Sequence, residues 1–136
     1  MAEWKYRIKK ESQLKSWFYG KKGNREFDSF NAFYNWYRNI EKQCFYCGIS
    51  EQECQEIVHK GILTSNRFPK YGNFKQGVNR GYWLEIDRKM PKEKYSKDNC
   101  VLACYFCNND KSDVFNEEQY KLFFQDRAKF LRSLLE

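Results

Sequence analysis

The chain has 136 residues, about the size of one compact domain, and carries 25 Lys and Arg against 18 Asp and Glu, a formal net charge of +7. This excess of positive charge favours a polyanionic partner such as nucleic acid. No stretch approaches the roughly 18–20 apolar residues of a membrane span, and residues 1–7 lack the apolar core of a secretory signal. We therefore expect one cytoplasmic domain over residues 1–136, with no membrane association.

Residues 1–43 are expected to form a basic segment followed by a helix. Positive side chains are concentrated near the start, and a turn-like stretch follows at 21–25. From 27 to 42, apolar residues recur at the spacing of one helix face. These residues are Phe30, Phe33, Tyr34, Tyr37 and Ile40. The pattern predicts an amphipathic helix over 27–42 whose aromatic stripe lies in the core.

The middle of the chain, residues 44–113, is expected to form the core of the domain. It opens on a tight turn at 44–48, and Ser50 with Glu53 three residues later fits the capping box of a short helix. Residues 60–80 then contain no acidic residue and are predicted to form a long functional loop.

A β-hairpin is predicted after this loop. Residues 82–87 alternate with period two, which is typical of a half-buried strand. Leu84 and Ile86 would face the core, and Glu85 and Asp87 would share the opposite face.

The returning strand is predicted at 99–103, and Cys104 opens a knuckle that leads into a helix. A further helix is expected over 117–135, within a C-terminal segment of 114–136, because Asn116 and Gln119 form a second capping box. Its apolar face would consist of Tyr120, Phe123, Phe124, Leu131, Leu134 and Leu135.

Two cysteine pairs, Cys44-x-x-Cys47 and Cys104-x-x-Cys107, have the spacing of zinc knuckles. Two such turns can complete a tetrahedral Zn²⁺ site with Zn–S distances of about 2.3 Å. A shell of four thiolates leaves no open position for water, so this zinc would be structural and would couple metal binding to folding.

Cys54 and Cys100 fall outside the pairs and are expected to be small buried residues, with Cys100 as an alternative ligand in place of Cys104. A secreted disulfide scaffold is the other interpretation of six cysteines. The CxxC spacing and the absence of an export signal argue against it.

The hairpin and second knuckle resemble the HNH endonuclease motif, through Leu84-Glu85-Ile86-Asp87-Arg88 and Tyr95-Ser96-Lys97-Asp98-Asn99-Cys100-Val101-Leu102-Ala103-Cys104-Tyr105-Phe106-Cys107-Asn108-Asn109-Asp110-Lys111-Ser112-Asp113. The match is closest to short restriction endonucleases of the PacI type, which share the Cys-Gly-Ile-Ser-Glu run at 47–51 and the Asp-Arg pair. The resemblance implies an α+β fold: a zinc-stapled ββα-metal core flanked by N- and C-terminal helices.

The family pattern implies roles for individual residues. Asp87 and Asn108 match the ligands of a catalytic divalent cation, Mg²⁺ or Mn²⁺, which takes oxygen ligands and can stabilise the charge on a phosphate. Asn99 matches the asparagine that holds the hairpin loop in shape, and Lys111 matches a position suited to a phosphate.

Arg88 departs from the family, in which a histidine general base usually follows the acidic ligand. A guanidinium stays protonated and is a poor base, although it suits the stabilisation of phosphate charge. Three groups remain for the proton: Tyr46, His59 and a metal-bound water that loses its proton to solvent or phosphate. The alternative roles are an aromatic packed over the knuckle for Tyr46 and a residue favourable to the helix dipole for His59.

Basic side chains around the predicted cleft would bind the DNA backbone. The set comprises Lys60, Arg67, Lys70, Lys75, Arg80, Lys89 and Lys111. Within the loop, Arg67, Lys75, Gln76, Asn79 and Arg80 could also contact base edges.

Together these features predict a metal-dependent endonuclease for double-stranded DNA, in particular a sequence-specific type II restriction enzyme. One site per chain favours a homodimer on a palindromic sequence, with helices 27–42 and 117–135 as subunit contacts. The alternatives are a non-cleaving zinc-stabilised DNA-binding module and a mobile-element nicking or homing nuclease.

Overall fold

The computed structural model describes residues 4–75, 78–112, 114, 116–123 and 126–136. The elements follow in the order α1 (Glu11–Gly20), α2 (Phe30–Asn39), α3 (Glu51–His59), the 3-10 turn η1 (Lys70–Gly72), β1 (Glu85–Arg88), β2 (Cys100–Ala103), α4 (Tyr105–Lys111), α5 (Glu117–Phe123) and α6 (Arg127–Ser133). Gln76, Asp113, Phe124 and the side chain of Phe123, which enter the predictions above, lie outside what is described.

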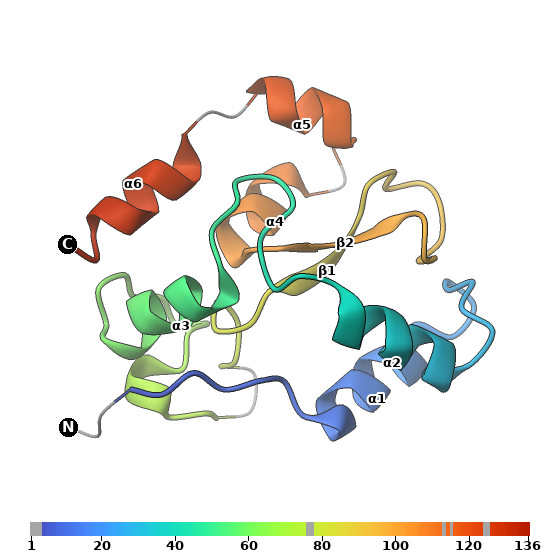
Figure 1. Cartoon of the computed structure of the whole chain (residues 1–136), viewed down its shortest axis with the longest axis horizontal. Helices are drawn as coiled ribbons and strands as arrows, with labels where there is room; N and C mark the ends of the chain where they lie inside the picture. Colours follow the sequence, from blue (N-terminus) through green and yellow to red (C-terminus); the bar gives the residue numbers. More distant parts are fainter. Residues whose placement is uncertain (1–3, 76–77, 113, 115, 124–125) are drawn as a thin grey trace.

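A two-stranded antiparallel hairpin with α4 against it forms the centre of the molecule (Figure 1). Its register pairs Glu85 with Ala103 and Arg88 with Cys100. The predicted α+β class is confirmed, and Leu84 and Ile86 are buried as expected.

The first strand is shorter than predicted, because it begins at Glu85 and not at residue 82. Gly81 has a φ of +85°, and the chain bends directly after it. Tyr82 and Trp83 are buried in this bend and pack with Phe68 in a small second cluster. Tyr82 and Trp83, which the sequence pattern placed in the strand, are therefore apolar because they pack in this cluster before the strand begins.

Helix α1 was not anticipated from the sequence. It buries Leu14 and Phe18 against α2, and Trp17 stacks on Phe33 with ring centroids 4.9 Å apart. Most of the α1 surface is polar, so this helix depends on its neighbour for its apolar contacts.

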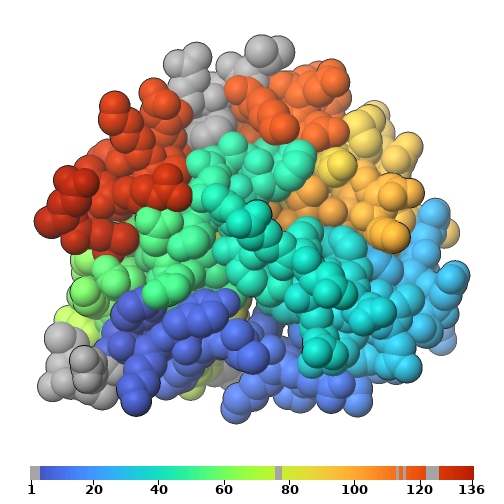
Figure 2. Space-filling view, viewed as in Figure 1, coloured from blue at the N-terminus to red at the C-terminus, as the bar shows by residue number. Residues whose placement is uncertain are grey.

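Helix α3 begins at the predicted capping box, in which Ser50 and Glu53 bond each other's backbone N–H groups at 3.0 and 2.9 Å. Residues 4–10 lie along this helix, as the blue surface against the green one shows in Figure 2. Gln55 joins the two segments, since it accepts from Arg7 N at 2.9 Å and donates to Arg7 O at 2.7 Å.

The C-terminal segment contains two helices, and the single helix predicted over 117–135 is therefore wrong. Its predicted cap is present, because Asn116 and Gln119 bond each other's backbone N–H groups. Asp126 has left-handed backbone angles of φ 54° and ψ 24°, which no continuous helix accommodates. The apolar residues Tyr120 and Leu131 are still buried, one on each helix.

Candidate functional site

The four cysteines of the two CxxC pairs come together in one cluster, as predicted. Their sulfur atoms all lie within 4.8 Å of one another, and Cys47 Sγ is 3.9 Å from Cys104 Sγ. Sulfur atoms around a tetrahedral zinc would be about 3.8 Å apart, given Zn–S bonds of about 2.3 Å. The donor set and its spacing therefore fit a structural Zn²⁺.

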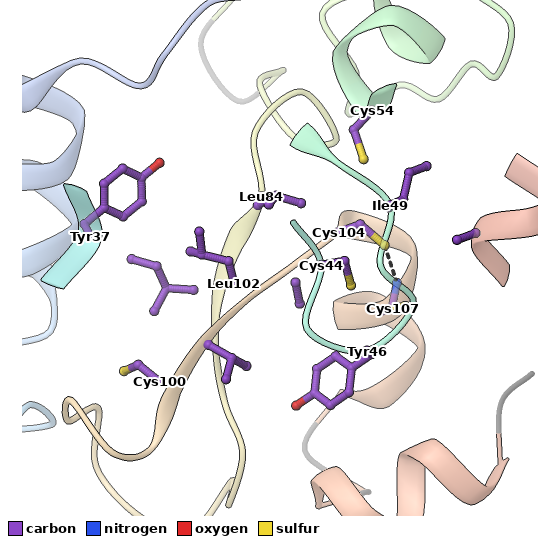
Figure 3. Packing of buried hydrophobic residues seen from close by; sticks show 14 of the residues in the cluster. Tyr37, Cys44, Tyr46, Ile49, Cys54, Leu84, Cys100, Leu102, Cys104 and Cys107 are labelled. Carbon is purple, nitrogen blue, oxygen red and sulfur yellow. Dashed lines mark hydrogen bonds between the residues drawn. The ribbon is translucent and has the colours of Figure 1, made fainter. Parts of the chain in front are cut away.

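The two spare cysteines lie outside this cluster (Figure 3). Cys54 is buried on α3 and Cys100 at the start of β2, and burial raises the pKa of both thiols, that of Cys100 to about 12. The alternative in which Cys100 replaces Cys104 as a ligand is therefore not supported, because Cys104 lies in the cluster.

The first knuckle is joined to the hairpin through its backbone. Phe45 N donates to Leu102 O of β2 at 2.8 Å, which brings the next residue, Tyr46, over the hairpin. The Tyr46 hydroxyl donates to Asp87 Oδ2 at 2.6 Å, and its ring packs edge-on against Tyr120. Burial, followed by the hydrogen bond to the Asp87 carboxylate, raises the pKa of Tyr46 above its usual value.

Lys111 approaches Asp87 from α4. Its side chain is fully buried, with Nζ 3.2 Å from Asp87 Oδ2 and donating to Arg88 O at 2.8 Å. The family pattern suggested that Lys111 lies near a phosphate. In the structure it instead contacts Asp87 from the buried side of the hairpin. One oxygen of Asp87 is held by a phenol and an ammonium, and the Asp87 side chain is 9% exposed.

Asp87, Arg88 and Asn108 line one cleft of about 280 Å³. The other lining residues are Arg80, Ile86, Pro91, Tyr95, Asn109 and Ser112. Asn108 is oriented by its Nδ2, which donates to Glu85 Oε1 at 2.8 Å. An amide and a carboxylate on adjacent elements therefore face the same small cleft, a donor set that suits a hard divalent cation.

Two further residues shape the cleft. Asn99 bonds the backbone of the hairpin loop through both ends of its amide, accepting from Met90 N at 2.9 Å and donating to Lys94 O at 3.1 Å. Arg88 packs over the Tyr95 ring at 4.8 Å and donates to Glu93 O at 3.2 Å. Loop and guanidinium are thus held in one arrangement.

His59 takes no part in this cleft. It is buried at the end of α3 beneath the η1 turn, where a Cβ on Gly72 would lie 3.2 Å from its ring. Neither ring nitrogen has a hydrogen-bond partner among the described residues.

The basic residues expected to bind DNA are spread over several surfaces. Arg80 lines the cleft and forms a bidentate salt bridge with Glu85, in which Nη2 donates to Oε1 at 2.6 Å and Nε donates to Oε2 at 3.0 Å. Lys111 is fully buried. The other five are exposed or half-buried: Lys60 pairs with Glu56, Arg67 bonds Tyr105, Lys70 packs on Tyr71, Lys89 on Phe45, and Lys75 lines a cavity of about 590 Å³.

Glu85 is a site residue for which the sequence predicted no role. It orients both Asn108 and Arg80 at the rim of the cleft. The signal was available, because Glu85 stands two residues before Asp87 on the same face of the strand.

The hairpin, the helix that follows it and the cysteine cluster define a ββα core with a possible metal site, as in HNH enzymes. A solved structure of the rare-cutting HNH restriction endonuclease PacI matches the chain with a TM-score of 0.63 and 26% sequence identity, covering 90% of this chain and 78% of that one. The similarity to the HNH family read from the sequence is thereby confirmed. No family model and no curated protein matches the chain.

Within the described part of the chain, no helix is long and apolar enough to cross a membrane.

Proposed function

We propose that this chain is a metal-dependent HNH endonuclease that hydrolyses phosphodiester bonds in double-stranded DNA. The observation that carries the proposal is the cleft in which Asp87, Arg88 and Asn108 meet. The likeness to PacI supports a nuclease-like function. The finer proposal is a sequence-specific type II restriction enzyme that acts as a homodimer, since the described part of the chain forms one such cleft and a duplex has two strands.

Two metal sites are part of this proposal. Cys44, Cys47, Cys104 and Cys107 would hold a structural Zn²⁺ that joins the first knuckle to α4. Asp87 and Asn108 would hold Mg²⁺ or Mn²⁺, which supplies charge stabilisation at the scissile phosphate.

The surrounding residues prepare the cleft for this chemistry. Lys111 and Tyr46 fix one carboxylate oxygen of Asp87, which leaves the other oxygen to a ligand. Arg88 places a permanent positive charge where a phosphate would enter. Its guanidinium donates to Glu93 O, and Asn99 holds this part of the hairpin loop in place by donating to the same carbonyl.

We assign proton transfer to Tyr46 in preference to His59, because the Tyr46 hydroxyl contacts Asp87 whereas His59 is outside the cleft. A phenol that donates to a carboxylate and has a raised pKa is protonated. Tyr46 can therefore act as a base only as the phenolate, after its own proton has passed to solvent and its hydrogen bond to Asp87 has been given up. A metal-bound water that passes its proton to solvent or phosphate is the remaining route.

A non-cleaving DNA-binding module is the second candidate. It is favoured by the Arg88 substitution and by the salt bridge that already occupies Asp87. Such a module would need the zinc site and the basic surface but no cation at Asp87.

The deciding experiment incubates zinc-loaded protein with supercoiled plasmid and genomic DNA in Mg²⁺ or Mn²⁺. The variant is Asp87→Asn, and the matched control is Asp98→Asn, an exposed residue of the same hairpin loop. Discrete fragments that vanish with Asp87→Asn and persist with Asp98→Asn support a restriction nuclease. Salt-sensitive binding without any cut or nick identifies the binding module, and neither binding nor cleavage rejects both proposals.

The proton route is tested by Tyr46→Phe, with His59→Ala as the comparison. Loss of a general base lowers the rate about 10²–10⁴-fold. We expect this loss for Tyr46→Phe only, and an unchanged rate in that variant would leave the metal-bound water as the route.

A further inference from the structure

Two further cavities lie beside the cleft at Asp87, on the side of the N-terminal residues. A second cavity of about 300 Å³ shares Arg80, Ile86, Tyr95 and Asn108 with the cleft. A third cavity of about 590 Å³ shares Gln13, Asn79 and Trp83 with the second. The shared lining residues place the three hollows next to one another in a row, here called the trough, from the hairpin to residues 4–10 and α1.

The second cavity is lined by two lysines from the N-terminal part, Lys9 and Lys21. Among the described residues, no carboxylate forms an ion pair with either of them. The two carboxylates that act on Lys9 through space are already bonded: Glu51 by Tyr6 and Leu84 N, and Glu85 by Arg80 and Asn108.

These two lysines are held at the trough by the fold. Lys21 packs over the Tyr95 ring at 5.2 Å, which places it beside the wall shared with the cleft. Burial lowers the pKa of Lys9, so its ammonium lacks part of its hydration and gains from an anion within the cavity.

The third cavity continues the positive charge. Arg7, Lys10 and Lys75 are among its lining residues. Arg7 lies over Phe74 at 5.2 Å, and its carbonyl accepts from Trp83 Nε1 at 3.0 Å, so this cation is also fixed in place. The acidic residues along the trough, Glu85 and Asp87, are both engaged in salt bridges.

We propose that residues 4–10, α1 and the turn after it form a second part of the DNA interface, in which Lys9 and Lys21 bind backbone phosphates that flank the phosphate in the Asp87 cleft. Arg7 and Lys10 extend this contact along the same strand. The proposal rests on the proposed function, and it adds an N-terminal phosphate site to a surface that the sequence analysis placed in the 60–80 loop and around the hairpin.

The test measures binding of a random-sequence DNA duplex across a range of salt, because non-specific binding is dominated by phosphate contacts. All proteins carry Asp87→Asn, so that the duplex stays intact. The variant is Lys9→Gln with Lys21→Gln. Its charge-matched control is Lys15→Gln with Lys22→Gln, two exposed lysines on α1 and the turn after it that do not line the trough.

Each lost phosphate contact reduces the slope of log K against log salt by about 0.9. For two contacts we expect a slope shallower by about 1.8, equivalent to roughly 60-fold weaker binding at 0.1 M salt. The control pair should change the slope by far less. Lys9→Arg with Lys21→Arg should restore the original slope, because arginine keeps the charge.

A slope for the Gln pair equal to that of the control pair would overturn the inference while leaving the proposed function intact. If the Asp87→Asn parent does not bind the duplex, the proposed function itself fails. Lysine acetylation of the parent protein provides a measurement without further variants: the duplex should protect Lys21 and leave Lys22 reactive. Equal reactivity of the two lysines would also overturn the inference.

Discussion

Substitution of Lys111 by methionine tests the buried ion pair between Lys111 and Asp87. The change keeps the length and apolar stem of a fully buried side chain and removes its charge. Asp87 then keeps only the Tyr46 hydroxyl on Oδ2, and Arg88 O loses the donor at 2.8 Å.

The structure sets the expected size of the effect. Removing one partner of a buried ion pair costs about 3–5 kcal/mol. Asp87 lines the cleft, so water can reach it and the cost falls toward the lower end, while the unsatisfied carbonyl adds about 1 kcal/mol. We expect the free energy of unfolding to fall by about 4 kcal/mol, or a Tm lower by roughly 15 °C.

The assay is urea unfolding of zinc-loaded protein, followed by circular dichroism without chelator. Lys129→Met, an exposed lysine of α6, is the control and should shift stability by less than about 0.5 kcal/mol. Adding Asp87→Asn to Lys111→Met removes the stranded charge and should recover part of the loss. A loss below about 1 kcal/mol for Lys111→Met, or further destabilisation by the second change, would refute the buried-pair reasoning.

Three other outcomes are expected. Cys104→Ser should abolish zinc binding and lower the Tm sharply, whereas Cys54→Ala should retain the zinc, as measured by metal analysis after gel filtration. Gly81→Ala should destabilise the fold by about 1–3 kcal/mol in thermal melts, because its φ is +85° and a Cβ would lie 2.7 Å from the Phe68 ring. Asn99→Ala should expose the hairpin loop to proteolysis and reduce DNA cleavage while zinc content stays constant.

Local features of the fold were predictable wherever residues close in sequence satisfy each other's hydrogen-bonding groups. The capping box of α3 depends on Ser50 and Glu53, three residues apart, and the cap of α5 on Asn116 and Gln119 in the same way. The period-two alternation of residues 82–87 identified Leu84 and Ile86 as inward side chains, and both are buried, although the strand begins only at Glu85.

Elements that depend on distant partners were missed or misjudged. The apolar side of helix α1 is short, and its burial depends on the contacts of Trp17 and Phe18 with Phe33 of α2. The C-terminal pattern of apolar residues continues across the break at Asp126, so periodicity could not reveal a change in backbone direction there.

The sequence by itself determined the cysteine cluster and the resemblance to HNH enzymes, because CxxC spacing and the Asp-Arg and Asn positions are local chemical patterns. Only the tertiary structure decided which groups contact Asp87. Tyr46 lies 41 residues from Asp87 and Lys111 lies 24, and no local pattern encodes distances across such separations. Packing of the first knuckle and α4 on the hairpin brings these side chains to the carboxylate, since burial of the charge requires partners from both.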